Sequence, residues 1–405
     1  MRMRIKDIAT KVGSGVTPRG GATVYQDSGI PLFRSQNVTN DGFLLDDIAY
    51  ISEKVHQSMS SSRLKPNDVL LNITGASIGR CYYLPKNFKE GNVNQHVCII
   101  RLKNNVIPAF LYFNLISATG QQMIDSCQTG ANREGLTKED LCNFEFEIPN
   151  IEQQTRIVKY LNDKTSKINS NISLLTSKRD AYLRLKKSII NCAVTKGLNP
   201  DVKMKDSGIE WIGEIPEHWE VKRMKDCVTL TKGRTPGEMT FDIVGLPYLT
   251  MDYLRNREGK DIMYPQNSEG LLKVAENEIL VLWDGANAGE FILSKQGYLG
   301  STMAIVECKH NAIIKKYLYY LLKAVEADSK YYANGTTIPH FDSTTILSRE
   351  YPMPPLPEQN AIATYLDEKC SKIDTIVANL EKQISKYADL KRSLIDEVIT
   401  GKRAV

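Results

Sequence analysis

The sequence contains no Cys-x-x-Cys pair, which a structural zinc site would normally require. Its eight cysteines are scattered along the chain at Cys81, Cys98, Cys127, Cys142, Cys192, Cys227, Cys308 and Cys370. Such spacing does not suggest a disulfide framework and is typical of free thiols in a protein interior. We therefore expect neither a metal site nor disulfides, and no motif requires a cofactor.

Long apolar runs are also absent. No stretch of 18 apolar residues occurs, and the opening segment 1–7 has no apolar core. A membrane-spanning helix needs about 20 apolar residues, and a secretion signal needs an apolar segment of roughly 7 to 15. The sequence therefore favours a cytoplasmic protein without a membrane partner.

Neither sign of charge dominates the composition. The 405 residues include 52 Lys and Arg against 47 Asp and Glu, for a formal net charge of +5, and 42% are hydrophobic. These proportions exclude disordered and collagen-like chains and fit a folded protein of two or three domains. The mild positive charge permits an anionic partner without requiring one.

What the sequence does contain is an internal repeat. Residues 148–196 align without a gap onto residues 353–401, and 16 of the 49 aligned pairs are identical. The identical pairs include Gln154 with Gln359, Tyr160 with Tyr365, and Lys186 with Lys391. Beyond the opening prolines, neither copy contains glycine or proline before Gly197 and Gly401. Each copy therefore predicts one long helix that ends at a glycine cap.

The apolar residues of the two helices follow heptad spacing. The second copy carries Ile373, Val377, Leu380, Ile384, Tyr387, Leu394 and Val398, with Lys391 as an interruption. The first carries Ile168, Ile172, Leu175, Tyr182, Ile189 and Ala193, with Arg179 and Lys186 on the seam. A narrow stripe of this kind is typical of coiled coils. We expect the helices, each about 66 Å long for roughly 44 residues, to pair antiparallel and to hold the preceding segments at opposite ends.

The globular segments before the helices repeat more faintly. Asn67, Gly75 and Gly79 correspond to Asn277, Gly285 and Gly289 at an offset of 210. The glycine pairs favour a shared structural turn over a phosphate-binding loop. Strands are expected at 69–71, 97–100, 279–282 and 304–306, and helices at 109–124 and 315–327. The fold class is therefore α+β, with two mixed α/β, strand-rich domains and two long helices in a pseudo-two-fold repeat.

These elements define an expected domain order. The globular segments are 1–147 and 220–352, the helical segments are 148–200 and 353–405, and a linker occupies 201–219. Glycines and prolines in the linker predict a structured segment, which Trp211 and Trp219 would anchor.

This organisation closely resembles the specificity (S) subunits of type I DNA restriction-modification systems. The resemblance covers nearly the whole chain and rests on the duplicated order, on Ser-Gly-Ile-Glu-Trp-Ile-Gly-Glu-Ile-Pro-Glu-His-Trp at 207–219, and on Pro-Pro-Leu-Pro-Glu-Gln at 354–359. The first helix start, 148–154, lacks the second proline. The resemblance implies two target recognition domains that each read half of a bipartite site in double-stranded DNA. It also implies helices that dock two methyltransferase (M) subunits, while the presence of restriction (R) subunits and the bases read stay open.

DNA recognition needs cations for phosphates, and planar amides or guanidiniums for base edges. The loops of the first segment supply Thr17, Arg19, Arg34, Gln36, Asn37, Asn94, Gln95, Asn132 and Arg133. Those of the second supply Arg234, Thr235, Arg255, Arg257, Asn287, Thr336 and His340. For each residue taken singly, an ordinary solvated loop position is the alternative.

Residues at the helix starts are candidates for methyltransferase docking because they precede the heptad seam. They are Ile157, Tyr160 and Leu161 in the first copy, and Ile362, Tyr365 and Leu366 in the second. Packing against the preceding globular segment explains them equally well.

The residues predict no catalytic role for the chain, as the resemblance also implies. Neither a Gly-x-x-x-x-Gly-Lys-Ser/Thr phosphate loop nor the Asp/Asn-Pro-Pro-Tyr/Phe segment of amino-methyltransferases occurs. The charged cluster 201–206 is typical of a solvated linker, and His96 is expected to be a hydrogen-bonded structural histidine. Two alternatives stay open: a coiled-coil adaptor whose globular segments bind protein instead of DNA, and an enzyme with an unrecognised active site.

Overall fold

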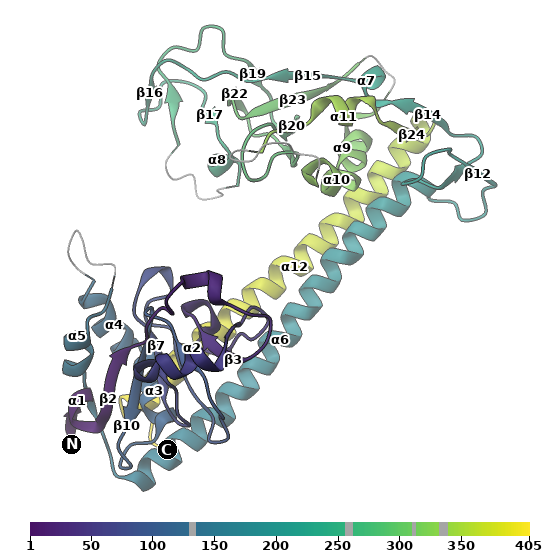
Figure 1. Cartoon of the computed structure of the whole chain (residues 1–405). Helices are drawn as coiled ribbons and strands as arrows, with labels where there is room; N and C mark the ends of the chain where they lie inside the picture. The colour runs from purple at the N-terminus through teal and green to yellow at the C-terminus, as the bar shows by residue number, and fades with distance from the viewer. Residues whose placement is uncertain (129–134, 256–261, 310–312, 332–338) are drawn as a thin grey trace. The chain divides into compact units, whose positions relative to one another are not determined.

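The computed structural model describes residues 1–128, 135–255, 262–309, 313–331 and 339–405. They form two compact units: unit 1 comprises Met1–Thr176 and Lys382–Val405, and unit 2 comprises Ser177–Glu381. Two long helices, α6 (Ile151–Lys196) and α12 (Leu356–Ile399), contribute to both units (Figure 1). The division between the units therefore falls inside the helices. Within the described ranges, no helix combines the length and apolarity that a bilayer crossing requires.

Unit 1 is built on a four-stranded antiparallel sheet in the order β2-β10-β7-β8. Its strands are β1 (Arg2–Arg4), β2 (Ala9–Ser14), β3 (Ile30–Phe33), β4 (Val38–Thr39), β5 (Gly42–Phe43), β6 (Ala49–Ile51), β7 (Val69–Asn72), β8 (Cys81–Tyr83), β9 (Asn92–Val93), β10 (Val97–Leu102) and β11 (Glu145–Glu147). Its shorter helices are α1 (Ile5–Ile8), α2 (Glu53–Ser58), α3 (Pro108–Ile116), α4 (Ala118–Ser126) and α5 (Lys138–Asn143).

Both faces of the central strand β7 are buried, and its successive side chains point to opposite faces of the sheet. Val69 and Leu71 of β7 belong to the hydrophobic cluster that contains Phe110 of α3. Leu70 belongs to a different cluster, which contains Phe33 of β3. The faces are therefore occupied by core packing, and polar loops are left at the strand ends.

Unit 2 repeats the sheet as β15-β23-β20-β21. Its strands are β12 (Met204–Asp206), β13 (Glu214–Pro216), β14 (Glu220–Arg223), β15 (Val228–Lys232), β16 (Met239–Thr240), β17 (Tyr248–Leu249), β18 (Tyr264–Pro265), β19 (Lys273–Val274), β20 (Ile279–Leu282), β21 (Phe291–Leu293), β22 (Gly297–Leu299), β23 (Met303–Cys308) and β24 (Glu350–Met353). Its shorter helices are α7 (Met224–Cys227), α8 (Met251–Arg255), α9 (Lys315–Ala324), α10 (Glu326–Tyr331) and α11 (Ser343–Ser348).

The two sheets agree in register and in unusual backbone geometry. Leu70 pairs with Ile99 in unit 1, and Leu280 pairs with Ile305 at the matching position of unit 2. The residues three positions before these strand leucines, Asn67 and Asn277, have φ of 68° and 63°. Non-glycine residues rarely adopt positive φ, so its recurrence at matching positions confirms the faint repeat at offset 210.

The glycine pairs after the central strands form the same turn in both units. Gly79 and Gly289 have φ of 84° and 86°. A Cβ atom at Gly289 would lie 2.7 Å from the backbone of Ser329, so only glycine fits there. This geometry confirms the interpretation as a structural turn.

The two shorter helices expected from the sequence are each broken in two. The expected helix 109–124 divides into α3 and α4 at Ser117, whose hydroxyl accepts a hydrogen bond from the Gly120 N–H at 3.2 Å and so caps α4. A Cβ at Gly120 would lie 2.2 Å from the Asn114 oxygen, so glycine permits the sharp bend. The expected helix 315–327 similarly divides into α9 and α10 at Val325.

Helices α6 and α12 pack antiparallel, as the heptad pattern predicts. In unit 2, Lys186 Nζ on α6 lies 2.6 Å from Asp374 Oδ1 on α12, and Val194 shares a core cluster with Ile362. In unit 1, the first turns of α6 share a cluster with the last turns of α12. The seam residues of α12 that are buried are Ile373, Val377, Leu380, Leu394 and Val398.

The linker forms a hairpin of β12 and β13, and its tryptophans anchor it as expected. Trp219 is 1% exposed, and its Nε1 donates a hydrogen bond to Glu358 Oε2 at 2.8 Å. A Cβ at Gly197 would lie 3.1 Å from the Trp219 ring, which favours glycine at the end of α6. Trp211 packs edge-on against Tyr351 with 5.7 Å between ring centroids.

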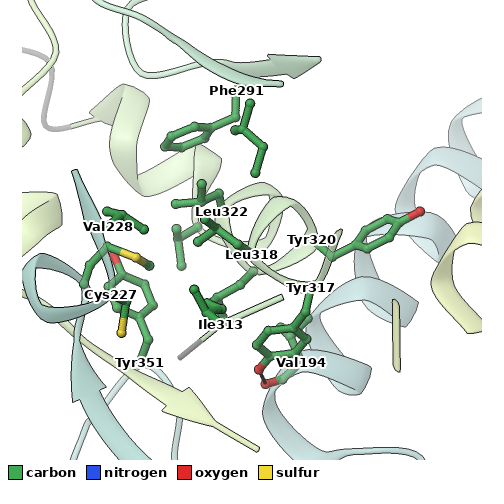
Figure 2. Close-up of a cluster of buried hydrophobic side chains, with 14 of the residues drawn as sticks. Val194, Cys227, Val228, Phe291, Ile313, Tyr317, Leu318, Tyr320, Leu322 and Tyr351 are labelled. Carbon is green, nitrogen blue, oxygen red and sulfur yellow. Dashed lines mark hydrogen bonds between the residues drawn. The ribbon is translucent and has the colours of Figure 1, made fainter. Parts of the chain in front are cut away.

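Tyr317 joins α9 to α6 inside the core of unit 2 (Figure 2). Its hydroxyl lies 3.3 Å from the Val194 carbonyl oxygen and 3.1 Å from that of Pro352. Burial raises the pKa of Tyr317, so the phenol stays protonated and can donate. The end of α6 is thus held by the domain that follows it in the sequence.

Candidate nucleic-acid interface

The polar loops of unit 1 meet at one end of its central sheet. Strand β2 ends at Ser14 opposite Cys98, and the antiparallel register places the end of β7 at the same edge. Gly15 continues from β2 so close to β9 that a Cβ would lie 2.1 Å from the Val93 oxygen. This approach, which only glycine allows, brings Thr17 next to Gln95.

Four side chains form a hydrogen-bonded relay in these loops. The Thr17 hydroxyl donates to Gln95 Oε1, which identifies the other branch of that amide as the NH2 group. Gln95 Nε2 lies 2.9 Å from His96 Nε2 and therefore donates to it. His96 then carries its proton on Nδ1 and donates to Thr74 Oγ1 at 2.5 Å. Both ring nitrogens are engaged, as expected for a structural histidine.

The relay fixes the orientation of the exposed Gln95 side chain. One N–H and one lone pair of the Gln95 amide are used, so one N–H and one lone pair remain for a ligand. Within the described residues, no further group bonds to this amide. A glutamine held in this way can pair with the N6 and N7 edge of adenine in the major groove.

The other candidates of unit 1 have different environments. Arg34 and Gln36 both bond to Asp47: Arg34 Nη2 lies 3.3 Å from Asp47 Oδ2, and Gln36 Nε2 donates to the same oxygen. Asn37 is 1% exposed and donates to the carbonyls of Leu44 and Asp47, at 2.9 and 3.2 Å. Asn37 therefore shapes the loop and presents no free amide.

Asn94 is likewise buried, 7% exposed, and accepts a hydrogen bond from the His96 N–H at 3.2 Å. Arg19 is exposed, and no described residue pairs with its guanidinium. Asn132 and Arg133 lie outside the described residues. The same end of the sheet thus carries Thr17, Arg19 and Gln95 on its surface and buries both asparagines.

Unit 2 places an ionic cluster at the matching end of its sheet. Asp284, which corresponds to Thr74, lies with Oδ1 2.6 Å from His340 Nδ1 and with Oδ2 2.9 Å from Lys232 Nζ. Lys232 also lies over the Trp283 ring, 5.4 Å from its centroid. Burial tends to raise the pKa of Asp284, but hydrogen bonds from Lys232 and His340 outweigh it and hold the pKa below its usual value.

Arg234 and Thr235 border an open groove of about 460 Å³. Gln266 and Asn267 line the same groove and are exposed, so it carries amides that suit base edges. Two exposed carboxylates, Glu238 and Glu269, line it as well and offset the charge of Arg234. Sequence reasoning missed both amides, because they lie far from the glycine-rich joins that directed attention to the loops. It also missed Lys232 and Asp284, which the correspondence of Asp284 with Thr74 could have revealed.

The remaining DNA-contact candidates of unit 2 also differ in their environments. Arg255 Nη2 lies 2.6 Å from Glu290 Oε2, and this bond helps to hold the pKa of Glu290 low against the opposing effect of burial. Asn287 is exposed. Arg257 and Thr336 lie outside the described residues. In the part of the chain that the structure describes, no group of three His, Cys, Asp or Glu side chains is placed to hold a metal ion.

The candidate docking residues fall into two groups. Leu161, Ile362 and Leu366 are at most 1% exposed and belong to the cores of their own units. Packing against the globular segment, the alternative considered above, therefore accounts for these three. Ile157, Tyr160 and Tyr365 are only partly buried.

Tyr160 and Tyr365 carry the same neighbour. Lys164 Nζ lies 5.6 Å from the Tyr160 ring centroid, and Lys369 Nζ lies 5.5 Å from that of Tyr365. These residues are identical pairs of the helical repeat. Each unit therefore presents one copy of the same small surface, an aromatic ring beneath a lysine.

A family model described as "Type I restriction modification DNA specificity domain" matches residues 1–175 and 216–386. The chain belongs to this family. The two matches cover both units and confirm the resemblance read from the linker and the helix starts.

Related proteins support the assignment. The type I restriction enzyme MjaVIII specificity subunit of Methanocaldococcus jannaschii is 37% identical over 188 residues, which are 46% of this chain and 43% of that one. The putative MjaX specificity subunit of the same organism is 21% identical over 410 residues, 98% of this chain and 92% of its own length. A solved chain of a type I R-M system has a TM-score of 0.68 at 15% identity and covers 98% of this chain and 97% of its own, which confirms the fold.

Proposed function

We propose that the chain is the DNA-specificity subunit of a cytoplasmic type I restriction-modification complex. Each unit reads one half of an asymmetric, bipartite site in double-stranded DNA. The observation that carries this proposal is the contrast between two sheets of matching strand order and register and the differing loops at their ends. Register and turns agree, whereas the position after the central strand is Thr74 in one unit and Asp284 in the other. Two domains that recognised the same DNA sequence would be expected to carry the same residue at this position.

In unit 1, Gln95 reads a base and Arg19 binds phosphate. The relay through Thr17 and His96 supports this division, because it orients Gln95 before DNA arrives and so reduces the entropy lost on binding. Arg19 is exposed and supplies a positive charge at the same end of the sheet.

In unit 2, Lys232, Arg234 and His340 face the DNA. Asp284 neutralises part of this charge and orients His340 through Nδ1, which leaves Nε2 directed away from the carboxylate. Gln266 and Asn267 in the adjoining groove supply amides for base edges.

The helices dock two methyltransferase subunits through the matching surfaces of Tyr160 with Lys164 and Tyr365 with Lys369. Two copies of one surface suit two copies of one partner. Methylation is the chemistry of these partners, and this chain supplies sequence selection. Restriction subunits join the same complex where the host encodes them.

The test uses the chain with the methyltransferase subunits of its own host. Binding to duplex DNA is measured by fluorescence anisotropy between about 50 and 200 mM salt, where log Kd should rise linearly with log salt. Methyl transfer should require both components. A chain that binds the methyltransferase but no duplex at low salt would be a protein adaptor, and methyl transfer by the chain alone would identify an enzyme.

A further inference from the structure

Unit 1 exposes a carboxylate, Asp47, whose position is fixed by several hydrogen bonds. Its side chain is 80% exposed. The Asp47 carbonyl oxygen accepts a hydrogen bond from Arg34 Nη2 at 2.7 Å and another from Asn37 Nδ2 at 3.2 Å. The carboxylate oxygen Oδ2 lies 3.3 Å from Arg34 Nη2 and accepts a hydrogen bond from Gln36 Nε2. Both the backbone and the side chain of Asp47 are therefore held in place.

The other carboxylate oxygen of Asp47, Oδ1, is left for a ligand. Within the described residues, Oδ1 accepts no hydrogen bond. Exposed ion pairs contribute little to stability, so stability alone does not explain why three side chains converge on an exposed residue. The arrangement resembles that of Gln95, which is also an exposed planar group with one side bonded to the chain and the other side unpaired. A group oriented in advance loses less entropy when it binds.

Asp47 is held at the same edge of unit 1 as Gln95. Strands β3 and β9 run parallel, with Phe33 beside Val93 at their ends. The segment that follows β3 begins with Arg34, and the segment that follows β9 contains Gln95, so the two segments leave the sheet side by side. Arg34 bonds directly to Asp47, so Asp47 belongs to the loops assigned to DNA.

A buried asparagine attaches the turn that holds Asp47 to the central sheet. Asn72 at the end of β7 is fully buried, and its Nδ2 donates to the Ser35 carbonyl oxygen at 2.7 Å. Ser35 lies between Arg34 and Gln36, the two side chains that hold the carboxylate. The sheet thus fixes the turn, and the turn fixes Asp47.

We propose that Asp47 reads a cytosine in the half-site of unit 1. The proposal deepens the proposed function and rests on it. A carboxylate only accepts hydrogen bonds, and the base edges in the major groove offer donors at cytosine N4 and adenine N6. Adenine also presents the N7 acceptor beside N6, which would face the same carboxylate, whereas the cytosine edge presents N4–H2 alone. Asp47 Oδ1 therefore accepts from cytosine N4, and the Arg34 guanidinium offsets the repulsion between the carboxylate and DNA phosphates.

Asp47→Asn should reverse the preference at this base pair. The asparagine oxygen still accepts from Arg34 and Gln36, so the amide NH2 takes the place of Oδ1 and donates. Thymine carries the O4 acceptor where cytosine carries the N4 donor, so a T·A pair suits the variant. The native complex should bind the C·G site about 10-fold more tightly than its T·A variant, and Asp47→Asn should prefer the T·A variant instead.

Asp46→Asn is the matched control, because Asp46 is the adjacent exposed carboxylate and no described residue pairs with it. Either substitution removes one negative charge and should strengthen binding to every duplex slightly. Only Asp47→Asn should change the ratio of the two dissociation constants, C·G against T·A. Anisotropy titrations of the chain assembled with its methyltransferase measure this ratio.

A change in the DNA tests the same contact with the protein unaltered. Replacement of the cytosine by 2-pyrimidinone removes the exocyclic amine that Asp47 would bind. The native complex should lose about 10-fold in affinity, and Asp47→Asn should lose much less, since it makes no bond to that amine. Comparison of the two proteins on both duplexes cancels the effect of the weaker base pair.

The outcomes separate this inference from the function on which it rests. The half-site of unit 1 is identified as the one that changes when residues 1–147 are exchanged. A half-site without a C·G pair, or an unchanged ratio in Asp47→Asn, would overturn the assignment of Asp47 while leaving the specificity role intact. If Asp47→Asn strengthens binding to every duplex far more than Asp46→Asn does, at an unchanged ratio, Asp47 only holds Arg34 and Gln36 away from DNA. A native complex that binds all duplexes equally overturns both proposals.

Discussion

Gln154 caps a neighbouring helix of its own unit: its Oε1 accepts a hydrogen bond from the Ile107 N–H at 2.9 Å. That N–H lies at the start of α3, where backbone donors have no partner within the helix. Gln154 is fully buried, and its Nε2 donates to the Asn105 and Pro149 oxygens at 3.0 and 2.9 Å. Gln359 repeats the bond to the start of α9 through the Ile314 N–H at 2.8 Å. Each long helix is thus hydrogen-bonded to the globular segment that precedes it in the sequence.

Gln154→Ala should lower the free energy of unfolding by about 2 to 4 kcal/mol, because it removes three hydrogen bonds and leaves buried backbone groups unpaired. Denaturant titration followed by circular dichroism measures the change. Gln153→Ala, at the exposed neighbouring position, is the control and should cost less than about 0.5 kcal/mol. Equal effects of the two substitutions would show that the buried hydrogen bonds contribute nothing specific.

Gln95→Ala and Arg19→Ala should affect DNA binding in different ways. Loss of Gln95 should cost about 1 to 3 kcal/mol on the cognate site and relax selectivity at one base pair. Loss of Arg19 should weaken binding to every duplex and lower the salt slope by about one. Anisotropy titrations of the assembled complex with the cognate duplex and its single-base variants measure both. If Gln95→Ala weakens binding to every duplex equally, Gln95 contacts the sugar-phosphate backbone of DNA and not a base.

Thr17→Val tests the relay that orients Gln95. The substitution keeps the shape of the side chain but removes the hydroxyl that donates to Gln95 Oε1, so the amide can rotate. Discrimination at the Gln95 base pair should fall while the salt slope stays unchanged, and Thr17→Ser should restore it. If Thr17→Val lowers the salt slope instead, Thr17 contacts phosphate and does not act through Gln95.

Asp284→Asn should destabilise the chain at pH 7 by less than about 1 kcal/mol, because it removes partly exposed ion pairs with Lys232 and His340. The pKa of Asp284 is lower in the folded state than its usual value of 3.8. Its ionised form therefore stabilises the fold above that value, and the contribution is lost as pH falls through the lowered pKa. Unfolding curves of both proteins should converge with acidification, and a constant difference down to pH 3 contradicts this.

Tyr160→Ala combined with Tyr365→Ala should reduce co-purification of the methyltransferase while the helical circular dichroism signal is retained. Both rings are partly exposed, so their removal leaves the helices intact. Exposed Leu174→Ala on α6 provides a control substitution. Undiminished co-purification would assign the tyrosines to packing within the chain alone.

Much of the fold follows from patterns that depend on few contacts. The long helices were predictable because more than forty residues lack glycine and proline and repeat in register. The strands β7 and β20 were predictable because each is a short apolar run whose two faces are both buried. The break at Ser117 was not predictable, because serine and alanine do not exclude a helix. The bend depends on the close approach of Gly120 to the backbone oxygen of Asn114, which exists only in the folded chain.

The site was less predictable because residue type does not determine exposure. Asparagine suits a base edge and also suits the inside of a loop, and Asn37 and Asn94 take the second role. The contact of Thr17 with Gln95 joins residues 78 positions apart, so it exists only in the folded chain. Leu161 on α6 is a further example: it was a docking candidate by residue type, but the folded chain buries it.

The most direct test of the account is the methylated DNA motif of cells that carry the complex, read by methylation-sensitive sequencing. The account predicts an asymmetric, bipartite motif with unspecified bases between the halves and half-site centres about 10 base pairs apart. Exchange of residues 1–147 for the same segment of another specificity subunit should change one half alone. A continuous or palindromic motif, or an exchange that alters both halves, would contradict it.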